Sequence, residues 1–148
     1  MRTVRLERTF DVVLVHDAID YMTSLDDLRA ALETVFVHCK RGGLALLVPD
    51  HLRETFQPST EHGGEDGEGR SLRLLEWTYD PDPSDDRVTV DYVFVLREDG
   101  QPVRVVHDQH ENGLFSQVDW LRLLSELGFV AKPVEDPFGR VLFLVHKP

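Results

Sequence analysis

The hydrophobic positions of the chain follow two patterns, which change near residue 71. In the first part, two continuous apolar runs, 10–16 and 44–50, flank a segment, 24–40, in which apolar residues recur every three or four positions. Parallel strands covered on both faces read as continuous apolar runs, so this arrangement predicts a strand-helix-strand unit. After residue 71 the period becomes two, which predicts antiparallel strands.

Further elements follow from the same patterns. Three strands with hairpin connections are expected over 72–79, 87–97 and 103–111, and Asp99-Gly100 is the strongest turn signal among them. A second amphipathic helix is expected over 117–127, and two closing strands over 129–134 and 140–146. The expected fold class is therefore α/β.

Two motifs in the first part resemble a known family. The first apolar run begins with Phe10-Asp11-Val12-Val13, and the second follows Lys40-Arg41-Gly42-Gly43. With this spacing, the stretch resembles the second half of a class I S-adenosylmethionine-dependent methyltransferase domain, although the family usually has Pro where this chain has Arg41. The antiparallel strands resemble the insertion of small-molecule N-methyltransferases, including those that act on amino sugars.

The resemblance implies a partial Rossmann-like sheet, strands four to seven with flanking helices, plus a three-stranded antiparallel meander. We expect one domain over 1–148, in which 51–70 is a mobile, acidic, Gly-rich loop and 71–113 is the insertion. The last strand is expected to run antiparallel between the fifth and sixth strands. The chain is expected to begin inside the family's domain, after its third strand.

The cofactor that the resemblance implies is S-adenosylmethionine (SAM), and the expected reaction is methyl transfer to a small molecule such as an amine. The sequence contains no Gly-x-Gly-x-Gly loop; Gly63-Gly64 lies in an acidic tract rather than between a strand and a helix. Whether the chain binds the cofactor alone therefore stays open. The alternative is a non-enzymatic α/β module that binds a ligand or a protein.

Polar residues follow both predicted parallel strands, at the edge where such sheets bind ligands. His16-Asp17 lies at the end of the first strand, and Asp50-His51 lies at the end of the second. With the resemblance, His16 and His51 are the expected catalytic residues, and His16 and Asp17 the expected cofactor-binding residues. The residues expected to bind the acceptor are Tyr21, Asp50, Glu76, Trp77 and His110.

Composition excludes several other functions. The net charge of −11 argues against a nucleic-acid surface, which needs clustered Lys and Arg. A single cysteine, Cys39, rules out an internal disulfide. No metal site is expected, because His107 and His110 are three apart on a strand and point to opposite faces. No apolar run has the length of a membrane span and no signal peptide is evident, so we expect a cytoplasmic protein.

The expected strand at 10–16 would lie at the edge of the sheet if the chain lacks the family's first three strands. An apolar edge strand is prone to pair with another chain. We therefore expect either a homodimer through this strand or a truncated chain that behaves poorly alone.

Overall fold

A computed structural model describes residues 1–148 of the chain. The structure divides into two compact units, which are described separately. Unit 1 comprises Met1–Phe56 and Gly113–Pro148, and unit 2 comprises Gln57–Asn112. No helix is long and apolar enough to cross a membrane.

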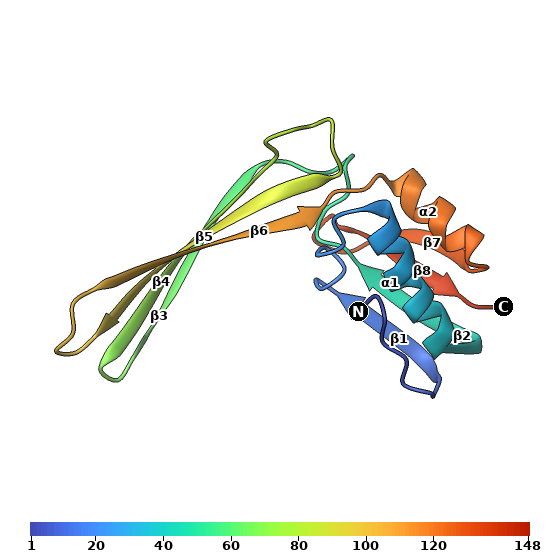
Figure 1. Cartoon of the computed structure of the whole chain (residues 1–148), viewed down its shortest axis with the longest axis horizontal. Coiled ribbons are helices and arrows are strands. Elements are labelled where there is room, and N and C mark those ends of the chain that lie inside the picture. The colour runs from blue at the N-terminus through green and yellow to red at the C-terminus, as the bar shows by residue number, and fades with distance from the viewer. The chain divides into compact units, whose positions relative to one another are not determined.

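Unit 1 is a four-stranded mixed sheet with two helices (Figure 1). Its elements are β1 (Phe10–His16), α1 (Leu25–His38), β2 (Cys39–Val48), α2 (Gln117–Glu126), β7 (Val130–Glu135) and β8 (Val141–His146). The strand order is β1-β2-β8-β7; β1 and β2 are parallel, and β8 is antiparallel to both of its neighbours. The expected α/β class and the antiparallel place of the last strand are confirmed.

At the N-terminus of α1, the side chain of Ser24 accepts a hydrogen bond from the backbone N–H of Asp27 and so caps the helix. No glycine caps its C-terminus. The helix ends at Cys39, whose backbone is already extended, with φ −84° and ψ 130°. Gly42, with φ +76°, lies inside β2 instead. The helix passes directly into the strand, so no left-handed cap is needed.

One face of the unit 1 sheet carries the hydrophobic core. Alternate strand residues, such as Leu47 of β2 and Phe143 of β8, are fully buried and pack with apolar residues of α1 and α2. The Trp120 ring of α2 stacks on the Phe143 ring, with centroids 5.0 Å apart. The opposite face stays accessible, since Val12 and Leu14 of β1 are 63% and 64% exposed.

Unit 2 is a four-stranded antiparallel sheet without helices (Figure 1). Its strands are β3 (Ser59–Gly67), β4 (Arg70–Tyr79), β5 (Arg87–Glu98) and β6 (Arg104–Gly113), in the order β3-β4-β5-β6. The three expected strands are present within a few residues of their predicted bounds. The sheet has one strand more than the predicted meander.

The extra strand, β3, lies where an irregular loop was expected, so this part of the prediction for 51–70 is wrong. All of β3 pairs with β4, from Ser59 opposite Thr78 to Gly67 opposite Arg70. The acidic, Gly-rich composition does not prevent pairing, because the ladder is formed by backbone groups. Gly64 helps it directly, since a Cβ there would lie 2.5 Å from the carbonyl oxygen of Leu72.

Candidate functional site

The parallel pairing of β1 and β2 gathers polar side chains at one edge of the sheet. His16 is the register partner of Val48, so both strands end at the same level. The backbone N–H of Asp17 then donates to the carbonyl oxygen of Val48 at 3.4 Å. His16-Asp17 and Asp50, predicted separately from two stretches of sequence, therefore lie at neighbouring strand ends, where α/β sheets bind ligands.

The side chains of His16 and Asp17 are in contact at this edge, and the two residues are called the His16–Asp17 pair. Nδ1 of His16 lies 2.6 Å from Oδ1 of Asp17, and the two side chains are 47% and 60% exposed. Asp17 has a positive φ of 50°, a conformation that is uncommon for residues other than glycine. Such backbone strain persists where the surrounding structure imposes it, and it is frequent at functional sites. The pair is thus held in place while it stays accessible.

Asp20 lies behind this pair and is buried, with 6% of its surface exposed. Both of its carboxyl oxygens lie 3.3 Å from the backbone nitrogen of Asp50, which donates to them. Burial, and then the charge of Asp50, raises the pKa of Asp20 to about 8. Asp20 is therefore mostly protonated at neutral pH, and it ties the loop after β1 to the end of β2.

Arg140, the residue before β8, brings a positive charge to the same edge. Its Nη1 lies 3.9 Å from Oδ1 of Asp50, and its Nε donates to Asp136 at 2.9 Å. The sequence predictions did not include Arg140 or Asp20. Arg140 could have been found, because a last strand antiparallel to β2 must begin where β2 ends. No sequence signal marks Asp20 as buried.

The other two predicted residues of this unit lie in the segments that follow β1 and β2. Tyr21 is in the loop after β1 and is 52% exposed. His51 follows Asp50, and its ring meets the Phe56 ring edge-on, with centroids 5.4 Å apart. The five predicted residues of unit 1 thus all belong to segments that leave β1 and β2 at their carboxyl ends.

The three predicted residues of unit 2 do not share one face of the sheet. Glu76 is the register partner of Tyr92, whose ring lies 5.1 Å from that of His110, so these residues are on one face. Trp77, the next residue after Glu76, points to the opposite face, because side chains alternate along a strand. A single acceptor site lined by Glu76, Trp77 and His110 together is therefore incompatible with this sheet.

The gathered groups suit the binding of polar and cationic molecules. The carboxyl groups of Asp17 and Asp50 accept hydrogen bonds and attract positive charge, whereas the ring of His16 offers one nitrogen as a donor and, when neutral, the other as an acceptor. No group of three or more His, Cys, Asp or Glu side chains is arranged to hold a metal ion. The site therefore offers acid-base and electrostatic chemistry from side chains.

Comparison with solved structures identifies the fold. The chain superposes on DesVI from Streptomyces venezuelae with a TM-score of 0.86 and 23% sequence identity, over 99% of this chain and 62% of that one. It also matches the sugar N-methyltransferase KedS8 from a Streptoalloteichus species, with a TM-score of 0.83 and 22% identity over 99% of this chain and 59% of that one. The chain has part of the methyltransferase fold.

A third methyltransferase structure agrees. SAM-bound CalS10, an amino pentose methyltransferase from Micromonospora echinaspora involved in calicheamicin biosynthesis, matches with a TM-score of 0.81 and 21% identity over 99% of this chain and 62% of that one. The chain thus spans about 60% of the length of these methyltransferases. Comparisons with protein-family models and with curated proteins give no match. The predicted resemblance is confirmed at the level of the fold.

Proposed function

We propose that this chain provides the acceptor side of a SAM-dependent methyltransferase that acts on a small-molecule amine. The observation that carries the proposal is the match of almost the whole chain, both units included, to methyltransferase structures, two of which are described as acting on sugars. The polar groups at the ends of β1 and β2 support it, since they lie where this kind of sheet binds ligands.

Under this proposal, Asp17 and His16 lie at the cofactor. SAM, when bound, supplies a methyl group activated by a sulfonium cation. The exposed carboxyl group of Asp17 suits that positive charge, and the His16 ring holds this carboxyl group in place at 2.6 Å. No residues of the chain form the glycine-rich loop that receives the nucleotide. The residues present therefore fit only one part of the cofactor.

His16 and His51 are the proposed proton acceptors. Methylation of an amine needs a free lone pair on nitrogen, which forms the new N–C bond as the C–S bond breaks and its electron pair stays on sulfur. The proton that the amine loses goes to an imidazole nitrogen of one of these histidines. Asp50 and Tyr21 then orient the acceptor, and this positioning contributes more to the rate than a strong base would.

Titration calorimetry with S-adenosylhomocysteine tests the proposal. The titration is carried out on the 148-residue chain and on a longer protein in which a segment carrying a glycine-rich loop precedes Met1. The Asp17→Asn variant of each protein is titrated in the same way. Binding that weakens in Asp17→Asn supports the cofactor role of this edge. Binding by neither protein would contradict the methyltransferase function. Binding by the longer protein alone would assign this chain the acceptor side only.

The second candidate function is a non-enzymatic module that binds a ligand or a protein. The absence of the glycine-rich loop from the chain favours it. The same titration separates the two candidates, because a binding module has no reason to recognise S-adenosylhomocysteine.

We also propose that the chain forms a homodimer through β1. This strand lies at the edge of its sheet, and its residues Val12 and Leu14 are largely exposed. Sedimentation of the wild-type chain is expected to show dimers, and the Val12→Lys, Leu14→Lys double variant is expected to sediment as a monomer. Val130→Lys is the matched control, since Val130 is 63% exposed on β7 at the other edge of the sheet. A monomeric wild type would exclude this dimer.

A further inference from the structure

Unit 2 contains a cavity at the end of its sheet where the turn between β3 and β4 and the turn between β5 and β6 lie. This unit 2 cavity is lined by residues within 65–72 and 96–105 and has a volume of about 1170 Å³. Small-molecule sites usually measure about 300–1,000 Å³, so a small organic molecule fits. The two turns are joined, because the backbone N–H of Asp99 donates to the carbonyl oxygen of Gly69 at 2.8 Å.

Three arginine side chains line the unit 2 cavity without a partner. They are Arg70 of β4, Arg97 of β5 and Arg104 of β6. None of these guanidinium groups takes part in a hydrogen bond or an ion pair, whereas Arg73 of the same sheet is bound to Asp66. A guanidinium group offers several N–H donors in one plane, an arrangement that matches a carboxylate. The lining therefore has free donors for an anion.

The carboxylates of the lining do not cancel these charges. Arg73 donates to Asp66 at 2.8 Å, and this hydrogen bond, more than any other interaction, lowers the pKa of Asp66. Glu65 and Glu98 are the other two acidic residues of the lining. Three guanidinium groups are thus set against two carboxylates that remain available. One positive charge is in excess here, in a chain whose net charge is −11.

Aliphatic side chains line the same cavity. Leu72 and Leu96 are register partners on β4 and β5, and both are half-buried. Val103 and Val105 are 59% and 62% exposed. A ligand with a hydrocarbon part would remove this apolar surface from water, which is favourable.

We propose that the unit 2 cavity binds an aliphatic carboxylate, that is, an acyl chain with a terminal carboxylate group. The carboxylate accepts hydrogen bonds from the free guanidinium groups, which are stronger than neutral hydrogen bonds because both partners are charged. The acyl chain covers the aliphatic side chains of the lining. This binding does not depend on the proposed methyl transfer, because every residue that it uses belongs to unit 2.

Other ligands satisfy only one part of the lining. Inorganic phosphate would pair with the guanidinium groups but leave the aliphatic side chains in water. An alkylammonium ion would cover those side chains but bring a like charge to the arginines. A nucleic acid is opposed by the net charge of −11. An aliphatic carboxylate satisfies both parts.

Titration calorimetry of the whole chain with decanoate tests the proposal. Decanoate is expected to bind saturably at one site. Acetate, which lacks the chain, and decyltrimethylammonium, which reverses the charge, are expected to bind about tenfold more weakly or less. Nuclear magnetic resonance locates the site, because decanoate is expected to shift backbone amide signals of residues 65–72 and 96–105.

Substitutions of exposed lining residues separate the two parts of the site. The Arg97→Gln, Arg104→Gln double variant is expected to weaken decanoate binding about tenfold or more. Arg97→Lys keeps the charge without the planar guanidinium group and is expected to lose less than Arg97→Gln. Val105→Ser is expected to weaken the binding of decanoate and to leave that of acetate unchanged.

Arg87→Gln is the matched control. Arg87 begins β5 at the end of the strand away from the unit 2 cavity, and its Nη1 lies 3.5 Å from Glu111. This variant makes the same change in the same strand and is expected to bind decanoate as the wild type does.

Four results would overturn the inference. The first is a wild-type chain that shows no saturable binding of decanoate. The second is binding of acetate or decyltrimethylammonium as tight as that of decanoate. The third is an equal loss of affinity in Arg87→Gln and in the Arg97→Gln, Arg104→Gln variant. The fourth is a set of amide shifts confined to unit 1, which would place the bound decanoate outside this cavity.

Discussion

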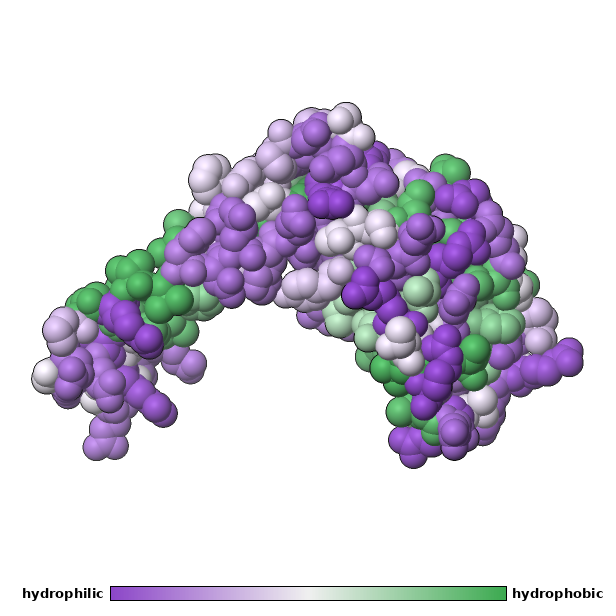
Figure 2. Space-filling model, in the orientation of Figure 1, coloured by the Kyte–Doolittle hydropathy of each residue, from purple (hydrophilic) through white to green (hydrophobic).

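The two units of the chain bury their hydrophobic side chains very differently. The core cluster lies entirely in unit 1, where two helices cover one face of the sheet. In unit 2, Val88 and Val90 are the only buried hydrophobic residues, while large ones such as Leu75 and Val105 stay 43% and 62% exposed. Figure 2 shows an apolar patch on this sheet between polar regions. Unit 1 is thus stabilised by packing, and unit 2 mainly by strand pairing.

The difference has a direct physical consequence. A sheet needs a second layer to bury an apolar face, and an isolated single layer gains little from the hydrophobic effect. Cross-strand pairs contribute only about 0.2–1 kcal/mol each. Substitutions should therefore affect stability strongly in unit 1 and weakly in unit 2, which the following predictions test from the largest effect to the smallest.

Truncation of the core of unit 1 should have the largest effect. Phe143 is fully buried and stacks on Trp120, so Phe143→Ala is expected to lower the free energy of unfolding by about 3–5 kcal/mol. Leu75→Ala in unit 2 removes an exposed side chain and is expected to cost less than about 1 kcal/mol. Urea unfolding followed by circular dichroism measures both. Similar losses would mean that unit 2 has a buried core of its own.

The sequence predicted unit 1 better than unit 2 for the same reason. The continuous apolar runs of β1 and β2 and the capped, amphipathic α1 specify packing, and these elements appear as expected. The strand β3 was missed because its residues are all exposed, so no apolar alternation marks it. Backbone pairing with β4 creates this strand, and single-sequence patterns do not report it.

The candidate site shows the same limit. His16, Asp17 and Asp50 could be found because they follow strands whose direction the sequence reveals. The burial of Asp20 depends on how the loop after β1 folds against the end of β2, which no local pattern describes. Trp77 was selected by residue type, but its register partner Asp91 lies on β5, and His107 and Gln109, which bond to Asp91, lie on β6.

The buried carboxyl group of unit 1 should make stability depend on pH. The pKa of Asp20 is about 8 in the folded chain and close to 3.8 in the unfolded chain. The unfolded state therefore releases this proton first, and stability falls as the pH rises from about 4 to about 8, by at most ~1.4 kcal/mol per pH unit. Asp20→Asn is expected to be free of this loss and to be more stable than the wild type at pH 8.

Urea unfolding at pH 5, 6.5 and 8 measures the effect of Asp20. The wild type and Asp20→Asn should converge at the lowest pH and diverge at the highest. Asp91 of unit 2 provides the opposite case, because its pKa is lowered in the folded chain. Its contribution to the free energy of unfolding is therefore lost as the pH falls through its pKa in the folded state. Parallel curves for the wild type and Asp20→Asn would show that Asp20 is ionised in the folded chain.

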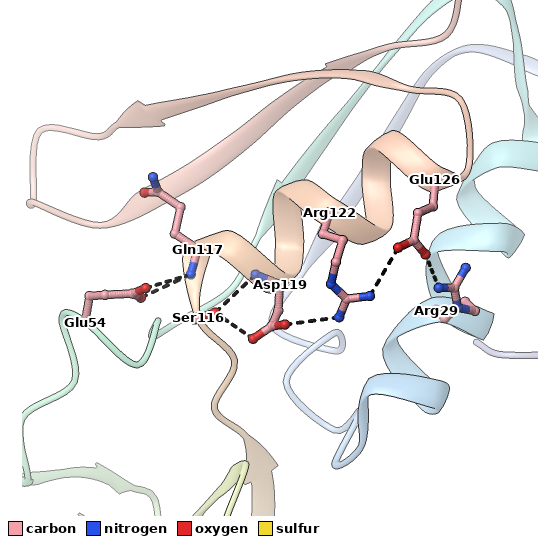
Figure 3. Close-up of polar contacts among 7 residues, drawn as sticks. All are labelled: Arg29, Glu54, Ser116, Gln117, Asp119, Arg122 and Glu126. Carbon is pink, nitrogen blue, oxygen red and sulfur yellow. Dashed lines mark hydrogen bonds and ion pairs between the residues drawn. The ribbon is translucent and has the colours of Figure 1, made fainter.

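The cap of α2 should have an intermediate effect. The side chain of Ser116 accepts a hydrogen bond from the backbone N–H of Asp119 at 3.1 Å, and Glu54 accepts one from that of Gln117 at 3.0 Å (Figure 3). Ser116→Ala is expected to cost about 1 kcal/mol, because it leaves a helix N–H without its partner. Ser116→Asn keeps an acceptor and should cost less in thermal unfolding. Equal costs would show that the cap does not stabilise the helix.

The smallest effect is expected for an exposed ion pair of unit 2. Arg73 of β4 donates to Asp66 of β3 at 2.8 Å, but the two side chains are 55% and 66% exposed. Solvent and salt screen such pairs, so Asp66→Asn should leave the free energy of unfolding unchanged at physiological salt and lower it slightly at low salt. Urea unfolding at two ionic strengths measures this. Asp66→Asn leaves the backbone hydrogen bonds between β3 and β4 intact. A large loss of unfolding free energy at both ionic strengths would therefore mean that charge pairs, rather than backbone pairing, stabilise this sheet.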